Sequence, residues 1–390
     1  MIRLLALAVV LGLAPAVAAA QTAPVADSGA FVVRMGTDTL AVERFVRTGD
    51  RIEGSLVRRD NPFTATRDYT AELNPDGSVR RLVVRLHTIG LSPTPSPYTF
   101  TYDYGADSAR SVYDRPAENE REERRVALGG PVMAALGHSH ALQEQALRMA
   151  RGMGADSVRL LPVGANGTVS LGVRRGGGDT LQLATVEGPA TAWVDARGRL
   201  MRYDGTRTLT KVTAERVGWI DVPALAADFA RRDHEGRGIG RLSPRDSVQA
   251  TVGGARVSVG YGRPSMRGRK IFGGILPWGR VWRTGANVTT QLTTDRALVI
   301  GGTPIPAGTY SLYTLPQPDR WTLIVNRKTG ESGREDTYDP AQDVARIPMR
   351  FRALDAPVET LTIRLDPEGD GAVLRVAWET TEAWVPVAAP

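Results

Sequence analysis

The sequence predicts a mainly β protein with two domains: an N-terminal antiparallel curved sheet or half-barrel that holds one helix, followed by a C-terminal β-sandwich. Three observations lead to this fold class. Short runs rich in β-branched and aromatic residues recur along the chain, and turn signals such as Asn74–Gly77 separate them. Apolar residues take helical spacing clearly only between Pro131 and Arg151. A chain of 390 residues allows each domain to bury a core of its own.

Residues 1–20 have the three parts of a secretory signal peptide. Arg3 supplies a positive start, Leu4–Leu13 is a short apolar run, and Ala18–Ala20 form a small-residue cleavage site. We therefore expect cleavage after Ala20 and a periplasmic or secreted protein. The apolar run is too short to cross a membrane, so we expect no transmembrane segment after cleavage. Residues 21–30 are expected to form a disordered lead.

Residues 31–231 predict a β-rich meander domain with one helix. Leu82, Val84 and Leu86 alternate with polar residues, which is typical of a half-buried strand. The charged run of residues 118–125 is expected to be a solvated loop or the start of a helix. A shorter helical pattern covers residues 222–231. A meander around one helix resembles periplasmic lipid carriers in its fold alone.

The main helical region, residues 131–151, contains residues that favour a break and a new helix start. Gly137 interrupts the pattern, and Ser139 is then a candidate N-cap for the second piece. His138 and His140 form the one close histidine pair. On a helix their rings would point to opposite sides, whereas on an extended segment they could share a metal. We expect a polar helix entry and no metal site.

Residues 232–242 are rich in glycine and charge and predict a linker. Residues 243–390 then predict the β-sandwich, because about ten short strands follow one another with frequent turns. The long excursion of residues 261–290 interrupts this domain. It combines the large aromatic residues Phe272, Trp278 and Trp282 with five arginines and one of the three lysines of the chain.

Two interpretations of this excursion stay open. In the first, its aromatic residues cap one end of the sandwich and its cations are solvated or paired. In the second, arginine forks and tryptophan faces bind a ligand. The candidate ligand-binding residues are Arg263, Arg269, Lys270, Trp278, Trp282, Arg283 and Asn287.

The strings Tyr261–Pro264, Gly268–Gly274, Pro277–Asn287 and Pro306–Leu312 carry a resemblance to a known family. Through them, residues 243–390 resemble the uncharacterised secreted bacterial proteins known as domain of unknown function 2911. The family has no established activity, so the resemblance implies no catalytic residues. The chain departs from the family pattern after Asn287, where Val288 replaces the usual glutamate.

Few residues could carry catalysis. The chain has no cysteine, and residues 243–390 also lack histidine, so no Ser-His or Cys-His nucleophile pair can form within that domain. P-loop, Gly-x-Ser-x-Gly and His-Glu-x-x-His strings are absent. Glu335, Asp336 and Asp339 form an acidic run, which is either a solvated turn or a weak calcium or acid–base site.

The net charge of +7 does not by itself indicate a nucleic-acid partner. Of the 49 basic residues 46 are arginines, they spread along the whole chain among acidic residues, and no nucleic-acid motif is present. We expect an exported envelope protein without a cofactor that binds a glycan, a lipid or an anionic small molecule and is not an enzyme. The alternative is a glycan hydrolase that uses paired carboxylates.

Overall fold

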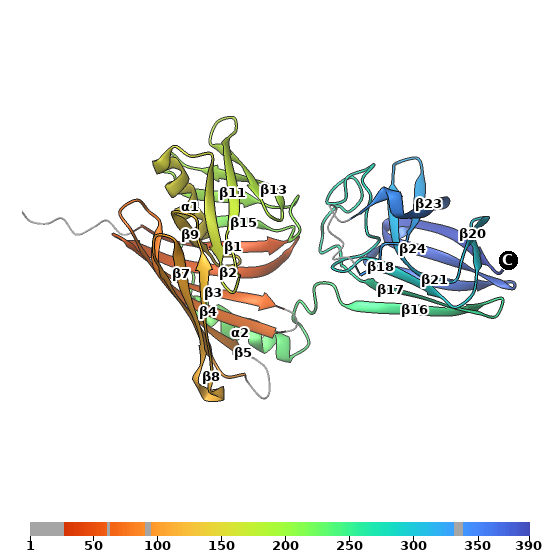
Figure 1. Cartoon of the computed structure of the whole chain (residues 1–390), viewed down its shortest axis with the longest axis horizontal. Coiled ribbons are helices and arrows are strands. Elements are labelled where there is room, and N and C mark those ends of the chain that lie inside the picture. Colours follow the sequence, from red (N-terminus) through yellow and green to blue (C-terminus); the bar gives the residue numbers. More distant parts are fainter. Residues whose placement is uncertain (1–26, 61–62, 90–94, 331–337) are drawn as a thin grey trace, which may run out of the picture.

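The computed structural model describes residues 27–60, 63–89, 95–330 and 338–390. The protein is mainly β, with a large N-terminal sheet, a separate C-terminal sheet and two helices (Figure 1). The predicted signal peptide and residues 21–26 lie outside the described residues. Residues 27–30, which we expected in the lead, belong instead to the first strand, β1.

The N-terminal sheet contains fifteen strands in a single open order from β8 through β1 and β15 to β9. Its strands are β1 (Asp27–Met35), β2 (Asp38–Thr48), β3 (Arg51–Asp60), β4 (Phe63–Leu73), β5 (Val79–Ile89), β6 (Tyr98–Tyr104), β7 (Ser108–Arg115), β8 (Glu120–Ala127), β9 (Val132–Ala135), β10 (Ser157–Pro162), β11 (Val169–Arg175), β12 (Thr180–Thr185), β13 (Gly188–Val194), β14 (Leu200–Asp204) and β15 (Thr213–Val217).

Two segments of this sheet differ from the sequence prediction. Residues 132–135, expected in the main helix, form β9, which pairs in parallel with β10 (Val132 with Arg159). The charged run of residues 118–125 is neither a loop nor a helix start over most of its length, because β8 pairs with β7 from Glu120 onward. Ion pairs across this edge, such as Arg110 with Glu123 at 2.6 Å, keep the charged side chains in solvent.

The helices lie on opposite faces of the curved sheet. α1 (His140–Met153) contacts β9, β10 and β14 within the concave face (Figure 1). α2 (Val222–His234) packs on the other face over β3 and β4. Neighbouring residues of β3 show the alternation, since Leu56 belongs to the core with α1 and Val57 to the smaller core with α2. α2 extends three residues into the segment that we predicted to be linker.

The start of α1 is held by a buried carboxylate. Ser139 is the N-cap, as its position after Gly137 suggested, and its hydroxyl accepts from the amide of Leu142. The side chain of Glu43 is fully buried and accepts from the Ser139 hydroxyl at 2.5 Å and from the His140 amide at 2.8 Å. Burial raises the pKa of Glu43. The carboxylate thus satisfies donors at the helix N-terminus that would otherwise be unpaired.

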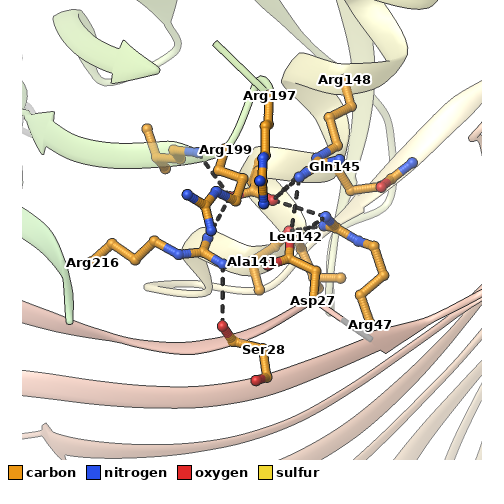
Figure 2. Close-up of polar contacts among 12 residues, drawn as sticks. Asp27, Ser28, Arg47, Ala141, Leu142, Gln145, Arg148, Arg197, Arg199 and Arg216 are labelled. Carbon is orange, nitrogen blue, oxygen red and sulfur yellow. Dashed lines mark hydrogen bonds and ion pairs between the residues drawn. The ribbon is translucent and has the colours of Figure 1, made fainter. Parts of the chain in front are cut away.

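A second buried carboxylate, that of Glu144, fixes the middle of α1. It is fully buried and receives ion pairs from Arg47 at 2.8 Å and from Arg216 at 2.7 Å. In Figure 2 these two guanidinium groups and that of Arg148 gather around Asp27, the first residue of β1. The network joins β1, β2, β15 and α1, so it stabilises the position of the helix inside the sheet.

The C-terminal domain is a nine-stranded sheet that folds over one core as a sandwich. Its strands are β16 (Arg245–Val252), β17 (Ala255–Gly262), β18 (Thr290–Thr294), β19 (Leu298–Ile300), β20 (Thr303–Ile305), β21 (Gly308–Pro316), β22 (Trp321–Asn326), β23 (Asp343–Glu368) and β24 (Gly371–Ala388). The long strands β23 and β24 pass from one layer to the other, and β16 contacts both of them although it does not pair with either. None of the helices in the described ranges is long and apolar enough to cross a membrane.

Candidate functional site: a basic pocket between the two domains

The excursion of residues 263–289, between β17 and β18, is built around an aromatic cluster. Phe272 and Trp282 are buried and pack edge-to-face at 6.0 Å between ring centroids. Phe272 also lies 4.9 Å from Trp321, and Trp282 stacks on Trp378 at 5.7 Å. Trp278 stacks on Phe272 at 6.0 Å but is 39% exposed. Aromatic residues therefore anchor the excursion in the core of the sandwich.

Carboxylates of the long strands hold the backbone of the excursion in place. The side chain of Glu379, in β24, accepts from the amides of Ile271 and Phe272. Glu359, in β23, accepts from the amide of Arg267 at 2.8 Å. The excursion is consequently an ordered wall, with its backbone tied to the sandwich.

The excursion also contacts the N-terminal domain. The amide of Thr37, in the turn between β1 and β2, donates to the carbonyl oxygen of Arg267 at 2.9 Å. The guanidinium of Arg267 pairs with Asp38 and donates to the carbonyl oxygen of Ile239. The ammonium of Lys211 donates to the carbonyl oxygen of Ile275 at 3.2 Å. These contacts dock the two domains beside the excursion.

A pocket of about 290 Å³ lies at this junction, with walls from both domains. Four of the seven candidate residues from the sequence line it, namely Arg269, Trp282, Arg283 and Asn287. Arg263, Lys270 and Trp278 do not line it. Arg263 is engaged with Asp246 and with the carbonyl oxygen of Leu361, while Lys270 and Trp278 face solvent. The structure brings part of the predicted set together and separates the rest.

The lining of the pocket combines basic side chains with apolar and aromatic ones. Its basic side chains are Arg58, Lys211, Arg269, Arg280 and Arg283, and within the described ranges of the chain no aspartate or glutamate lines it. Its apolar and aromatic part includes Met35, Leu40, Leu209, Leu242, Ile275, Leu276, Val281, Trp282, Tyr313, Tyr338 and Trp378. Such a lining suits an anion that carries an apolar group.

Sequence reasoning missed the contribution of the N-terminal domain. Arg58, His138 and Lys211 come from three separate segments of that domain. Two of them have left-handed backbones, with φ of 67° at His138 and 53° at Lys211, which is uncommon for residues other than glycine. Only the rarity of lysine in this chain could have drawn attention to Lys211.

His138 adds no charge to the pocket at neutral pH. Burial, followed by the charge of Arg58, holds the pKa of His138 well below its ordinary value. Arg269 is half-buried, and its guanidinium donates to the carbonyl oxygens of Met266 and Ser265, each at 2.8 Å. Desolvation and the neighbouring Arg267 lower the pKa of Arg269. Glu359 and Asp38 act on this pKa in the opposite direction, so neighbouring carboxylates compensate part of the charge of Arg269.

The other chemistry that we considered is not assembled at this pocket. Among the described residues, no group of three or more histidine, aspartate and glutamate side chains could hold a metal. Asp339 caps a short 3₁₀ turn, η3 (Pro340–Gln342), by accepting from the amide of Ala341. Glu335 and Asp336, the rest of the predicted acidic run, lie outside the described residues.

Fold and pocket define a two-domain, mainly β protein with a basic site at the junction. Residues 243–387 match the family described as "Protein of unknown function (DUF2911)", which confirms the resemblance seen in the sequence for this part of the chain. No curated protein matches the chain.

Two solved structures were compared with the chain. A DUF1089 family protein from Pseudomonas aeruginosa is 16% identical, with 43% of this chain and 91% of that one covered and a TM-score of 0.32. A β-barrel-like protein of the domain of unknown function DUF1849 from Brucella abortus is 10% identical, with 52% and 98% covered and a TM-score of 0.28. Likeness of this degree carries no argument about function.

Proposed function

We propose that this protein is an exported envelope protein that binds an anionic small molecule with an apolar part, without chemical conversion, in the pocket between its domains. The observation that carries the proposal is the lining itself. Among the described residues, the lining brings together five basic side chains from both domains and contains no aspartate or glutamate. The leader-like residues 1–20 support export.

The chemistry of the lining selects this ligand class over the others. Arginine presents rigid forks of donors to carboxylate, sulfonate or phosphate, while Trp282 and the aliphatic side chains of the lining offer apolar surface to the rest of the ligand. A hydrolase that works with two carboxylates would need acidic side chains within reach of the bound ligand. The part of the lining that the structure describes contains no aspartate or glutamate, which supports binding over carboxylate catalysis.

Fluorescence titration with two matched dyes tests the proposal. Anilinonaphthalene sulfonate carries one sulfonate on an apolar aromatic body, and N-phenyl-1-naphthylamine is the same body without the charge. We expect the sulfonate to bind more tightly than the neutral dye, because the basic lining adds an electrostatic contribution to apolar burial. We also expect this preference to shrink as salt is added.

Substitutions then place the binding at the pocket. Arg280→Gln together with Arg283→Gln should weaken sulfonate binding by about tenfold, the effect of losing charge-assisted hydrogen bonds of about 1.5 kcal/mol. Binding of the neutral dye should change little. Lys270→Gln removes an exposed cation of the same excursion that does not line the pocket, and it should leave both affinities unchanged. Equal affinities for the two dyes, or equal effects of the two sets of substitutions, would refute the proposal.

A further inference from the structure

A second hollow, of about 340 Å³, lies on the N-terminal sheet and shares no lining residue with the pocket between the domains. It is lined by side chains of β6, β7 and β8 and by Gly164, Ala165 and Asn166, in the connection between β10 and β11. This connection is fastened over the strands, because the amide of Gly164 donates to the hydroxyl of Tyr102 at 2.7 Å and Arg124 donates to Asn166 at 3.1 Å. The hollow is a built groove with two walls.

Aromatic rings form a ladder along β6, and two of them, Phe100 and Tyr102, line the groove. Alternate residues of β6 point to the same face, and four of them in succession are aromatic: Tyr98, Phe100, Tyr102 and Tyr104. Neighbouring rings along the ladder lie 5.9–6.3 Å apart between centroids. Tyr113, opposite Phe100 on β7, approaches it to 5.3 Å.

Two aromatic side chains in this region are not fully buried in the core of the domain. Phe100 and Tyr113 remain partly exposed and line the groove, whereas Tyr102, the next ring along β6, lines it but is buried. Phe100 and Tyr113 therefore contribute accessible aromatic surface to the groove on a paired set of strands.

The other side of the groove carries paired polar groups. Glu122 lies opposite Tyr113 in the register of β7 and β8, and its carboxylate pairs with Arg124 at 2.5 Å. Glu120 accepts from the hydroxyl of Tyr113 at 3.2 Å and lies 3.9 Å from Arg115. Because each carboxylate has an arginine beside it, the groove combines many hydrogen-bonding atoms with little net charge.

We propose that this groove binds a neutral carbohydrate. A sugar ring has an apolar C–H face, which is attracted to the electron-rich face of an aromatic ring such as Tyr113 or Phe100. Its edge carries hydroxyl groups, which can donate to the carboxylates of Glu120 and Glu122 and to the carboxamide of Asn166. Because the paired groups leave little net charge, the groove offers an anion no electrostatic advantage, so the groove and the basic pocket select different ligands.

Binding of the full-length protein to an array of neutral and acidic glycans tests this proposal. We expect binding to neutral glycans. Tyr113→Ser should weaken it by about tenfold or more through loss of a stacking ring, and Tyr113→Phe, which keeps the ring, should retain most of it. Trp219→Ala is the matched control, because it removes a 60% exposed aromatic residue of the same domain that lies outside the groove. Circular dichroism of each variant shows whether it is folded.

Three results would overturn the proposal: no glycan is bound, only acidic glycans are bound, or the Tyr113 and Trp219 variants lose binding equally. The same variants show whether the groove and the basic pocket bind their ligands independently. The variant with Arg280→Gln and Arg283→Gln should bind glycans like the unmodified protein, and Tyr113→Ser should bind the sulfonate dye normally. If Tyr113→Ser is unfolded, Glu122→Gln takes its place with the same expected loss, since a substituted amide is a weaker acceptor for sugar hydroxyls than a carboxylate.

Discussion

The backbone amide of Thr37 and the carbonyl oxygen of Arg267 form a 2.9 Å hydrogen bond between positions 230 residues apart. This bond places the turn between β1 and β2 directly on the excursion of the C-terminal domain. Gly36 makes the approach possible. It has φ of 62°, and a Cβ atom there would lie 1.8 Å from the carbonyl oxygen of Arg267. The sandwich is thus docked through a turn in which a side chain has no space.

The first prediction concerns this docking and the linker. Limited proteolysis should cut first within residues 235–240, which separate the two domains. Gly36→Val should accelerate this cleavage, because the new side chain collides with backbone and separates the domains. Gly49→Val is the matched control, since Gly49 has a similar φ of 58° but no atom within 4 Å of an added Cβ. It should introduce the same backbone strain without faster cleavage of the linker. First cuts inside either sheet would contradict the prediction.

The second prediction separates the two tryptophans of the excursion. Trp282→Ala should reduce the free energy of unfolding by about 3–5 kcal/mol, because this side chain is buried against Phe272 and Trp378. Trp278→Ala should cost about 1 kcal/mol or less, because the residue is 39% exposed. Urea denaturation followed by circular dichroism measures both. Similar losses would show that the excursion acts as a single cooperative unit.

The third prediction concerns Arg269, which the sequence alone would place on an exposed surface. An exposed arginine could be replaced at a cost of about 0.5 kcal/mol or less. The half-buried Arg269 donates to two backbone carbonyl oxygens instead, so Arg269→Ala should cost about 1.5–3 kcal/mol. Arg269→Lys should recover only part of this loss, because an ammonium cannot reproduce the fork. If the urea midpoints of the Arg269 variants equal that of the unmodified protein, these two hydrogen bonds contribute nothing to the free energy of unfolding.

The fourth prediction concerns stability at acidic pH. Burial lowers the pKa of His140 to about 4, whereas an unfolded histidine has a pKa near 6.5. Between these values the unfolded chain binds a proton that the folded protein does not, so stability falls as the pH drops from 6.5 to 4. The full loss from His140 is about 3 kcal/mol.

A variant isolates this contribution from other groups that titrate nearby. His138 changes stability in the same direction, and the raised pKa of Glu43 acts in the opposite direction. His140→Phe keeps the ring that packs between Phe31 and Tyr203 but removes the titration. Its free energy of unfolding should vary less between pH 6.5 and 4 than that of the unmodified protein. Parallel pH profiles would exclude His140 as the source.

The fifth prediction concerns export. Mass spectrometry of the exported protein should find a mature chain that begins at Gln21, with or without cyclisation to pyroglutamate. The reason is the charged start, apolar run and small-residue site of residues 1–20. An intact Met1 on the exported protein would show that no cleavage occurs.

Local patterns predicted several elements correctly because their cause is local. The turn at Asn74–Gly77 forms with φ of 82° at Gly77. The amide of Gly77 donates to the carbonyl oxygen of Asn74. Ser139 caps α1 because a short side chain with an acceptor can reach the first helical amides. The aromatic residues of the excursion and the strings shared with the family are also local features of the sequence.

Elements that depend on distant partners were predicted less well. Residues 132–135 have apolar side chains compatible with a helix, but pairing with β10 draws them into the sheet edge. The charged residues of β8 carry no alternating apolar pattern, and pairing with β7 supplies their structure. In both segments hydrogen bonds to a distant part of the chain determine the secondary structure, which the local pattern of apolar residues does not reveal.

The sequence by itself determined the mainly β fold, with one sheet in the N-terminal part and a separate one in the C-terminal part, and the aromatic composition of the excursion. The tertiary structure decided which cations share a site. Arg58 and Lys211 meet Arg269, Arg280 and Arg283 only because the turn at Gly36 docks on the excursion. Periodicity and turn chemistry act over a few residues, whereas this docking depends on the shape and hydrogen-bonding groups of two folded surfaces.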